Sequence, residues 1–236
     1  MNKTTVVIIS GKKQSGKTSS FEFITSKLTD KTNKQYSFAD PLKQFLMDVF
    51  GLTNDQCNGT DEQKNSLTKI KWADLPMPVE DIVKLIIQSR DPKSLPKYER
   101  NVAQVAAEGI NMLWRDNVLM TAREVMQVFG SNICRKMYGN CWAEATLRKI
   151  QDTKPDYAFI TDARFPNEID TFLELDPIVI RLNRNPFDSK HVSETAMDDF
   201  DWTKLKRFVC IDNANMTLDE KNEAVYQAFL QLDEIK

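Results

Sequence analysis

The sequence predicts an open α/β sandwich, in which a five-stranded parallel sheet carries helices on both faces and a mostly helical insertion separates the second and third strands. Five short β-rich runs recur along the chain, and helical patterns lie between most of them. The third and fourth runs are almost continuously apolar, which is typical of buried parallel strands. The runs are Thr5–Ser10, Lys34–Phe38, Tyr157–Thr161, Ile178–Leu182 and Phe208–Ile211.

The first predicted strand leads directly into a phosphate-binding sequence. The letters GKKQSGKT, from Gly11 to Thr18, match the pattern G-x-x-x-x-G-K-[ST]. The pattern lies between a strand and a helix predicted over Thr18–Leu28, which is the context that such a loop requires. Its glycines let backbone N–H groups turn inward around phosphate oxygens, and the helix adds its positive N-terminal end. A chance turn is the alternative, and the flanking strand and helix argue against it.

This loop predicts ATP and Mg²⁺ as cofactors. We expect the Lys17 ammonium to reach the β- and γ-phosphates and the Thr18 hydroxyl to coordinate Mg²⁺. The candidate donor-binding residues of the loop are Gly11, Ser15, Gly16, Lys17, Thr18 and Ser19.

A charged segment, FADPLK, follows the second predicted strand. It places Asp40 and Lys43 at the carboxyl edge of the sheet, at the beginning of a helix. Open α/β sheets bind their ligands at this edge, so Lys43 is well placed for the phosphate of an acceptor. On the residues alone, we interpret Lys43 as a surface lysine.

The chain is predicted to form a single domain, residues 1–236, with an insertion. No convincing strand is predicted between Asp40 and Asp156, and Asn54–Arg100 is polar and interrupted by prolines. Because α/β proteins of this length commonly combine one core with an insertion, we interpret residues 54–118 as a helical subdomain on the acceptor side.

Within the long gap, Met120–Met137 is predicted to be one helix. Thr121 and Glu124 form a capping box at its start. Apolar residues recur at intervals of four and are expected to form a buried stripe; they are Val125, Phe129, Ile133 and Met137.

A polar row recurs on another side of this predicted helix. Arg123, Gln127, Ser131 and Arg135 are also spaced by four residues, so two guanidinium groups flank a glutamine. Such a row suits a phosphate and a base edge, and a solvated helix face is the alternative. Gly130 argues against that alternative, because an interior glycine costs a helix about 1 kcal/mol and indicates close approach of a ligand or another helix.

Two segments at the ends of later strands carry further candidates. Asp162 follows the third strand, where a carboxylate can hold Mg²⁺ or orient an acceptor, and Arg164 can meet the charge of a transferring phosphate. Pro166 opens a helix nearby, so helix capping is the alternative role for Asp162. After the fourth strand, a segment that contains Arg181, Arg184, Lys190 and His191 is either a basic lid over ATP or a solvated loop.

The last segment, Thr217 to Leu232, is predicted to be an amphipathic helix. It opens with a capping box formed by Thr217 and Glu220. Its apolar stripe is expected to contain Leu218, Val225, Phe229 and Leu232.

Composition excludes several classes of function. With 32 Lys and Arg against 34 Asp and Glu, no general polyanion-binding surface is indicated, so nucleic acid is not expected as the main partner. Four cysteines without a C-x-x-C pair, and a single histidine, predict free thiols and no zinc site. No membrane span or export signal is recognised, so we expect a soluble, cytoplasmic protein.

The motifs together resemble a known enzyme family. The segments GKKQSGKTS, FADPLK, REVMQVFGSNICRKMYGNCW, ITDARFPNE and RLNRNP occur in the order found in deoxynucleoside monophosphate kinases of tailed bacteriophages. The resemblance covers both ends and the middle of the chain, and leaves mainly residues 54–118 uncovered. It implies the three-layer sandwich of P-loop NTPases and transfer of the ATP γ-phosphate to a deoxynucleoside monophosphate (dNMP). For a phage-encoded protein it also implies the host cytoplasm.

The resemblance further implies residue roles. Lys13 joins the loop that holds the donor phosphates and faces the acceptor, Arg184 belongs to the lid, Gln127 is a candidate for the base edge and Trp142 packs near the base. The catalytic candidates are Lys17, Arg123, Asp162 and Arg164. The substrate-binding candidates are Lys13, Asp40, Lys43, Arg123, Gln127, Gly130, Arg135 and Trp142.

Two other functions remain open at this point. Phosphomevalonate kinases of the animal type have a similar glycine-lysine loop, a similar PLK turn and an aspartate-x-arginine turn. A nucleotide-gated binding protein would need only one phosphate pocket, whereas the basic residues of this chain are spread over several motifs. Base preference, selectivity for deoxyribose and a possible homodimer do not follow from the sequence.

Overall fold

The computed structural model describes residues 4–76, 78, 81–82, 85, 118–185 and 195–235. The chain divides into two compact units. The first unit combines Met1–Pro41 with Arg135–Lys236, and the second is Leu42–Cys134.

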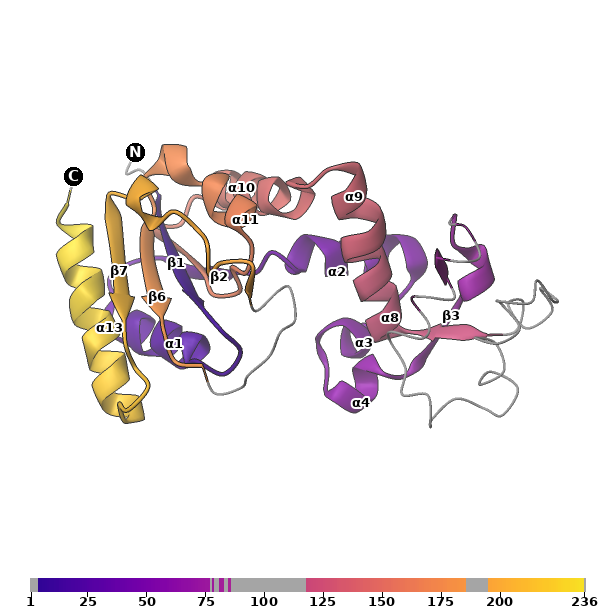
Figure 1. Cartoon of the computed structure of the whole chain (residues 1–236), viewed down its shortest axis with the longest axis horizontal. Helices are drawn as coiled ribbons and strands as arrows, with labels where there is room; N and C mark the ends of the chain where they lie inside the picture. Colours follow the sequence, from indigo (N-terminus) through magenta and orange to yellow (C-terminus); the bar gives the residue numbers. More distant parts are fainter. Residues whose placement is uncertain are drawn as a thin grey trace. The chain divides into compact units, whose positions relative to one another are not determined.

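The first unit contains the predicted parallel sheet (Figure 1). Its strands lie in the order β2-β5-β1-β6-β7, and every neighbouring pair is parallel. The five strands match the five predicted runs to within two residues at each end. They are β1 (Thr5–Gly11), β2 (Asn33–Tyr36), β5 (Tyr157–Ile160), β6 (Ile178–Leu182) and β7 (Arg207–Ile211).

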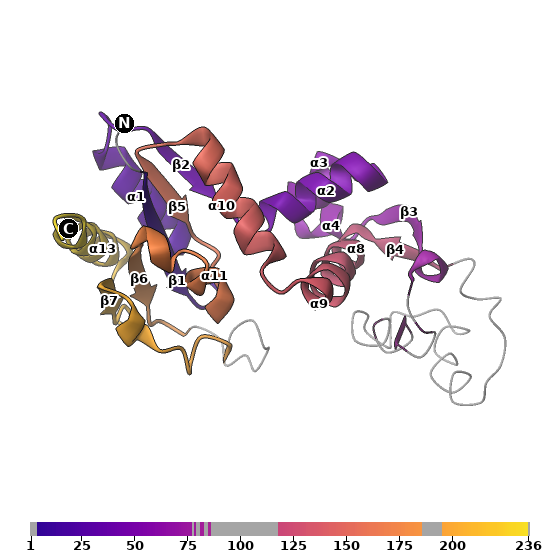
Figure 2. The ribbon, with the colours of Figure 1, turned by 90° about the horizontal axis from the view of Figure 1, so that it is seen from above.

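Helices cover both faces of this sheet, as Figures 1 and 2 show. On one face, α1 (Lys17–Lys27) and α13 (Leu218–Asp233) pack against Val7 and Ile9 of β1. On the other face, α10 (Cys141–Thr153) and α11 (Pro166–Asp170) pack against alternate residues of the same strand. Because successive side chains of a strand point to opposite faces, β1 contributes to two cores. The prediction of an α/β sandwich is confirmed.

The loop after β1 lies where the order of the strands reverses. From β1 the chain passes to β2 and β5 on one side, and then to β6 and β7 on the other. In open α/β sheets the crevice outside the carboxyl ends of the strands at this point is the usual ligand site. The topology therefore places the glycine-rich loop at the expected position.

Helix α13 differs from the prediction on its buried face. Its capping box forms between Thr217 and Glu220 as predicted. Leu218, however, is 59% exposed, so its assignment to the buried stripe was wrong. Lys221, four residues before Val225 in the stripe, is only 3% exposed.

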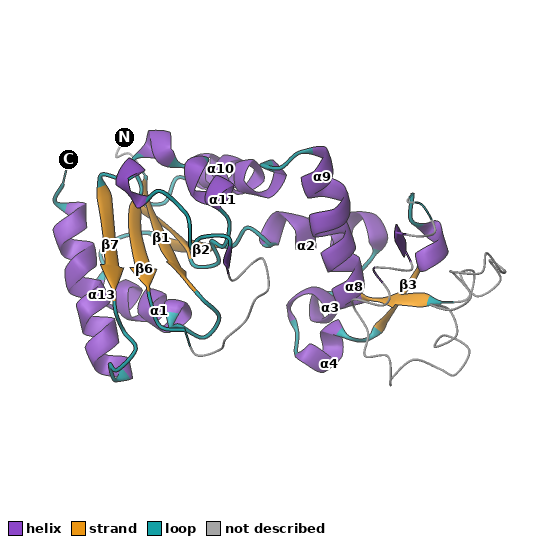
Figure 3. Cartoon of the chain, in the orientation of Figure 1, coloured by secondary structure: helices purple, strands orange, loops and turns teal. Residues whose placement is uncertain are grey.

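The second unit contains short helices and a small sheet (Figure 3). Helix α2 (Asp40–Phe50) leads into it, and α3 (Asn54–Asn58) and α4 (Asp61–Lys64) follow, each with a Thr–Gln capping box. Strands β3 (Leu67–Lys71) and β4 (Leu119–Thr121) pair in antiparallel orientation. The expectation that this part of the chain has no strand was therefore wrong, because strands this short depend on pairing with a distant segment rather than on a local pattern.

The helical segment predicted over Met120–Met137 is present but is not a regular α-helix. After α8 (Ala122–Gln127) the chain forms a π-helical stretch, Val128–Cys134, and then α9 (Arg135–Met137). Because π-helical bonds run from i to i+5, they displace later residues from the predicted row. Met137 is accordingly 82% exposed, so its assignment to a buried stripe was wrong.

Gly130 lies in the π-helical stretch and contacts another helix. A Cβ atom at this position would lie 2.7 Å from Cδ2 of Leu42 in α2. Of the two explanations predicted for this glycine, close approach of a helix is therefore the one that the geometry supports.

Some predictions lie outside the described residues. They include most of residues 77–117, and with them much of the predicted insertion, as well as Lys190 and His191 of the predicted lid. Within the described residues, no helix is long and apolar enough to cross a membrane.

Candidate active site

The glycine-rich loop has a backbone that requires its glycines. Gly11 and Gly16 have φ angles of 149° and 100°, and Gln14 also has a positive φ of 60°. A Cβ atom on Gly11 would lie 2.8 Å from the Leu182 carbonyl oxygen, so a side chain there would collide with β6. Gly16 is the N-cap of α1, which directs the first free N–H groups of that helix toward the loop. This backbone geometry suits an anionic ligand.

Lys17 is the first residue of α1, and its ammonium group folds back over the loop. Its Nζ donates hydrogen bonds of 2.7 Å to the carbonyl oxygens of Gly11 and Lys12. The Thr18 side chain in the same helical turn is exposed, as is that of Lys13 at the tip of the loop. Lys17 and Thr18 are thus placed at the loop as the sequence predicted.

Two residues near the C-terminus of the chain form hydrogen bonds with the glycine-rich loop. Asn213, which is 2% exposed, donates from Nδ2 to the Ser15 carbonyl oxygen at 2.9 Å and accepts from the Arg184 backbone N–H at 3.0 Å. Lys221 donates to the Gly16 carbonyl oxygen and to the hydroxyl groups of Ser19 and Ser20. Neither residue is among the candidates predicted from the sequence.

A basic pocket lies at the carboxyl edge of the sheet in the first unit. It brings together cationic side chains from the loop after β1, the segment after β5 and the end of β6. Its lining residues are Ser10, Gly11, Lys12, Ala163, Arg164, Arg181, Leu182, Asn183 and Met197. Lys12, Arg164 and Arg181 therefore face one cavity, which suits an anionic ligand.

Arg181 is held in place by the segment that returns toward β7. Its guanidinium donates to the Met197 carbonyl oxygen at 2.8 Å, pairs with Asp198 and lies 4.8 Å from the centre of the Trp202 ring. Asp198 also lies 4.0 Å from the Lys12 ammonium. This carboxylate therefore connects the glycine-rich loop to the end of β6.

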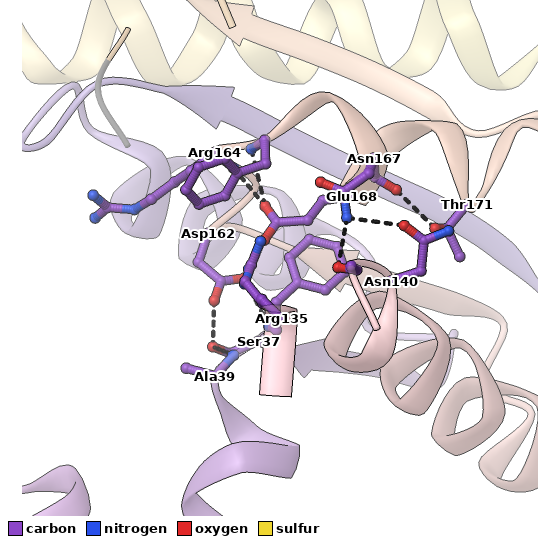
Figure 4. A network of polar contacts seen from close by, with 12 residues as sticks. Ser37, Ala39, Arg135, Asn140, Asp162, Arg164, Asn167, Glu168 and Thr171 are labelled. Carbon is purple, nitrogen blue, oxygen red and sulfur yellow. Dashed lines mark hydrogen bonds and ion pairs between the residues drawn. The ribbon is translucent and has the colours of Figure 1, made fainter. Parts of the chain in front are cut away.

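Asp162 follows β5, as predicted, and its carboxylate is engaged by the turn after β2 (Figure 4). Ser37 donates its hydroxyl to one carboxylate oxygen at 2.5 Å, and the Phe38 backbone N–H donates to the other at 3.1 Å. Burial raises the pKa of Asp162, and the hydrogen bonds from this turn oppose that rise. Asp162 therefore holds in place the turn at Ser37 and Phe38, which leads into α2.

Arg135 takes part in a second polar network of the first unit (Figure 4). Its guanidinium pairs with the carboxylate of Glu168, which is only 3% exposed, and lies over the Phe165 ring at 4.5 Å. Glu168 also accepts from the backbone N–H groups of Arg164 and Phe165 at the start of α11. Burial raises the pKa of Glu168, while these donors oppose the rise.

Arg123 lies in the second unit and has an exposed partner. Its side chain pairs with Asp61 at 2.6 Å and donates to Asn65 at 2.8 Å. The Asp61 side chain is 90% exposed, so this ion pair contributes little to stability and can be exchanged at low cost. Gln127, one turn later, is exposed. The two arginines of the predicted row therefore lie in different units. The carboxylate partner of Arg123 is exposed, whereas that of Arg135 is buried.

The remaining candidates are placed as follows. Asp40 begins α2 and accepts from the Ser37 backbone N–H at 3.1 Å. Lys43 is half-buried on α2, in the second unit. Trp142, in the first turn of α10, packs against the core of the first unit. Arg184 is exposed after β6.

The sequence contained one usable signal for the residues that were missed. Lys221, Val225 and Phe229 are spaced by four residues, so this spacing predicts that Lys221 lies on the buried face of α13. Asn213 and Lys12 have no such pattern, because their roles depend on the segments that the fold brings next to them.

The part of the chain that the structure describes contains no cluster of side chains typical of a metal-binding site. Among those residues, no group of three or more His, Cys, Asp or Glu side chains is suitably placed for a metal ion.

All four cysteines are free thiols, as predicted.

Comparison with known proteins identifies a family. A family model described as deoxynucleotide monophosphate kinase matches residues 5–199. A search of curated proteins finds no matching relative.

Proposed function

Because the chain belongs to the deoxynucleotide monophosphate kinase family, we propose that it transfers the γ-phosphate of ATP to a dNMP and releases a deoxynucleoside diphosphate. The observation that carries the choice of donor is the glycine-rich loop. It combines two glycines with positive φ, a helix N-terminus and the Lys17 ammonium at the switch point of the sheet. The family match does not favour a phosphomevalonate-type kinase or a nucleotide-gated binding protein.

The chemistry required of the chain is placement and charge neutralisation. Phosphoryl transfer needs the donor and acceptor oxygens in line and positive groups around the moving phosphoryl group, and it needs no nucleophile from the enzyme. In this proposal Lys17 neutralises the donor phosphates. Lys12, Arg164 and Arg181 line the adjoining cavity and add positive charge where the phosphoryl group moves.

For the acceptor, the surroundings of the two predicted arginines support different roles. Arg123 can exchange its exposed partner Asp61 for a phosphate at little cost. Arg135 would have to leave the buried Glu168 carboxylate without its cation. We therefore propose Arg123, with Lys43 and Gln127, for the acceptor and assign Arg135 to the support of the fold.

The donor set fits Mg²⁺ in part. The exposed Thr18 hydroxyl beside the loop is a hard oxygen ligand, and Mg²⁺ bound with nucleotide phosphates commonly needs few protein ligands. The Asp162 carboxylate is a second candidate, although hydrogen bonds from the Ser37–Ala39 turn already engage both of its oxygens. When bound, Mg²⁺ would offset part of the negative charge of the phosphates.

Replacing Asp162 with asparagine separates the two roles of this residue. Asparagine has nearly the same shape and can still accept from Phe38 and donate to Ser37, so we expect the melting temperature to stay within about 2 °C of the wild type. If the carboxylate charge serves Mg²⁺ or the acceptor, turnover should fall by about tenfold or more.

The control for this experiment is Ser37→Ala, which removes the hydrogen bond to Asp162 and the one that Ser37 accepts from the Ala39 backbone N–H, but keeps the carboxylate. Turnover should then change less than in Asp162→Asn. Normal turnover of Asp162→Asn at every Mg²⁺ concentration would assign Asp162 to the turn alone.

The proposal predicts that diphosphate forms only when a monophosphate acceptor is supplied. The test incubates the protein with ATP and, in turn, dAMP, dGMP, dCMP, dTMP and the corresponding ribonucleotides, and identifies the products chromatographically. A reaction without acceptor measures background hydrolysis of ATP. Formation of deoxynucleoside diphosphate would support the proposal and define the base preference. If no acceptor yields a diphosphate although ATP binds, the proposed reaction is wrong.

The nearly balanced charge of the chain supports free nucleotides rather than nucleic acid as the ligands. We leave self-association as a prediction, and sedimentation velocity with and without nucleotide would test it.

A further inference from the structure

A buried lysine lies behind the glycine-rich loop. Lys221 is 3% exposed and comes from α13, which packs alongside α1. Its Nζ donates to the Gly16 carbonyl oxygen at 2.9 Å, to Ser19 Oγ at 2.7 Å and to Ser20 Oγ at 2.9 Å. All three acceptors belong to the turn in which the loop becomes α1, so the ammonium group is fixed to the loop by its full set of donors.

This ammonium has no counter-ion among the described residues. Its recorded partners are a carbonyl oxygen and two hydroxyl groups, and no described carboxylate lies within ion-pair distance of its Nζ. The charged groups of α13 and of the three elements that pack against it are Lys17, Glu22 and Lys27 of α1, Asp219, Glu220, Glu223 and Asp233 of α13, Arg181 of β6 and Arg207 of β7.

The nearest of these acids along α13 is already engaged. Glu220 accepts from Thr217 in the capping box at the start of the helix. Burial therefore lowers the pKa of Lys221 from its ordinary value to about 8. A residue that only filled the core would avoid this cost, as Val225 and Phe229 do on the same face.

The position of the charge indicates its purpose. Lys221 lies against the N-terminal turn of α1, where the helix dipole is already positive. A buried cation beside a positive helix end is unfavourable by itself, and it becomes favourable when an anion binds in front of the same turn. The loop that precedes this turn has the form of a phosphate-binding loop.

We propose that Lys221 is a positioning residue of the donor site, which holds Gly16 and Ser19 in place and supplies, behind the loop, a second positive charge that increases the affinity for a nucleotide polyphosphate. This role rests on the donor site proposed above. Lys17 acts at the mouth of the loop, whereas Lys221 acts through the loop and touches no phosphate.

The role has a consequence for pH. Since an anion favours the charged form of Lys221, the charged form in turn favours the anion. Nucleotide affinity should therefore decline as the pH rises through about 8, where Lys221 loses its proton. Because bound nucleotide raises the pKa of Lys221, the fall in affinity should begin near the pKa of the free protein and end at the higher pKa of the nucleotide-bound protein.

The test measures the dissociation constant of ATP by titration calorimetry, without divalent metal and at low salt, at pH 7 and pH 9. Lys221→Met keeps the length of the side chain and removes the charge. We expect this variant to bind ATP about tenfold more weakly than the wild type at pH 7. The wild type should lose affinity between pH 7 and pH 9, and the variant should not.

The matched control is Lys27→Met, which makes the same change of net charge at the exposed, opposite end of α1. It should bind ATP as the wild type does. Lys221→Arg keeps a charge that does not titrate in this range, so it should bind at pH 7 and lose less affinity at pH 9 than the wild type. If thermal unfolding shows that Lys221→Met is not folded, the pH dependence of ATP binding by Lys221→Arg tests the proposed role of Lys221 instead.

The outcomes separate this role from the proposed function. A wild-type protein that fails to bind ATP would overturn the donor site and, with it, the role of Lys221. A wild type that binds ATP while Lys221→Met binds equally well at pH 7 would overturn the role of Lys221 alone. An equal loss in Lys27→Met would overturn it as well, because net charge would then account for the effect.

Discussion

Replacing Lys17 with alanine should reduce turnover by about 100-fold to 1,000-fold while the protein stays folded. The Lys17 ammonium is the positive charge at the mouth of the glycine-rich loop, and positioned charges of this kind lower the barrier by preferring the transition state. In the fold, its side chain makes two hydrogen bonds to carbonyl oxygens of the loop, whose loss costs about 1 kcal/mol each. The effect on catalysis should therefore far exceed the effect on stability.

The measurement is the initial rate of diphosphate formation with saturating ATP and the best dNMP, together with the melting temperature. Lys27→Ala removes an exposed lysine from the other end of α1 and should retain the wild-type rate. If Lys17→Ala turned over at close to the normal rate, the loop would not be the donor site.

Replacing Arg135 with alanine should destabilise the protein by about 3 kcal/mol, because it leaves the buried Glu168 carboxylate without its cation. For a chain of this size that corresponds to a fall of about 6–12 °C in melting temperature. The KM for the dNMP should change little. This expectation differs from the substrate-binding role that the sequence suggested for Arg135, and the two measurements distinguish the roles.

The pH dependence of this variant has a definite sign. Burial already raises the pKa of Glu168 above that of the unfolded chain, and loss of the Arg135 charge raises it further. The folded state then binds the proton more tightly than the unfolded state, so stability falls as the pH rises from the unfolded pKa to the folded one. The difference between variant and wild type should therefore be small at acid pH and large at neutral pH.

The double variant Arg135→Ala with Glu168→Gln is the control. Its neutral amide oxygen can still accept from the backbone N–H groups of Arg164 and Phe165, so much of the lost stability should return at neutral pH. The opposite result for Arg135→Ala, an unchanged melting temperature with a KM raised tenfold or more, would assign Arg135 to the acceptor site.

The parts of the fold that depend on local pattern were accessible from the sequence. Apolar runs such as Ile178–Leu182 report burial on both faces of a sheet, and the letters GKKQSGKT fix a loop whose backbone needs glycines at two positions. The capping boxes at Thr121 and Thr217 were also correctly located, because a cap involves residues only three positions apart.

The parts that depend on distant partners were not accessible. The spacing of four residues joined Arg123 and Arg135 in one row, but the π-helical stretch between them interrupts that spacing, and the structure pairs Arg123 with Asp61 and Arg135 with Glu168. The pairing of β3 with β4 likewise joins segments that lie about 50 residues apart in the chain.

The sequence by itself determined the parallel sheet, the glycine-rich loop and the family to which the chain belongs, since each depends on patterns of neighbouring residues. Only the tertiary structure decided what surrounds them. Lys221 and Gly16 are 205 positions apart, and no local pattern links a lysine on the last helix to a loop near the first strand. Burial and charge pairing are properties of the packed chain, so the supports of the loop and the partner of each arginine became visible only once the helices and strands were in place.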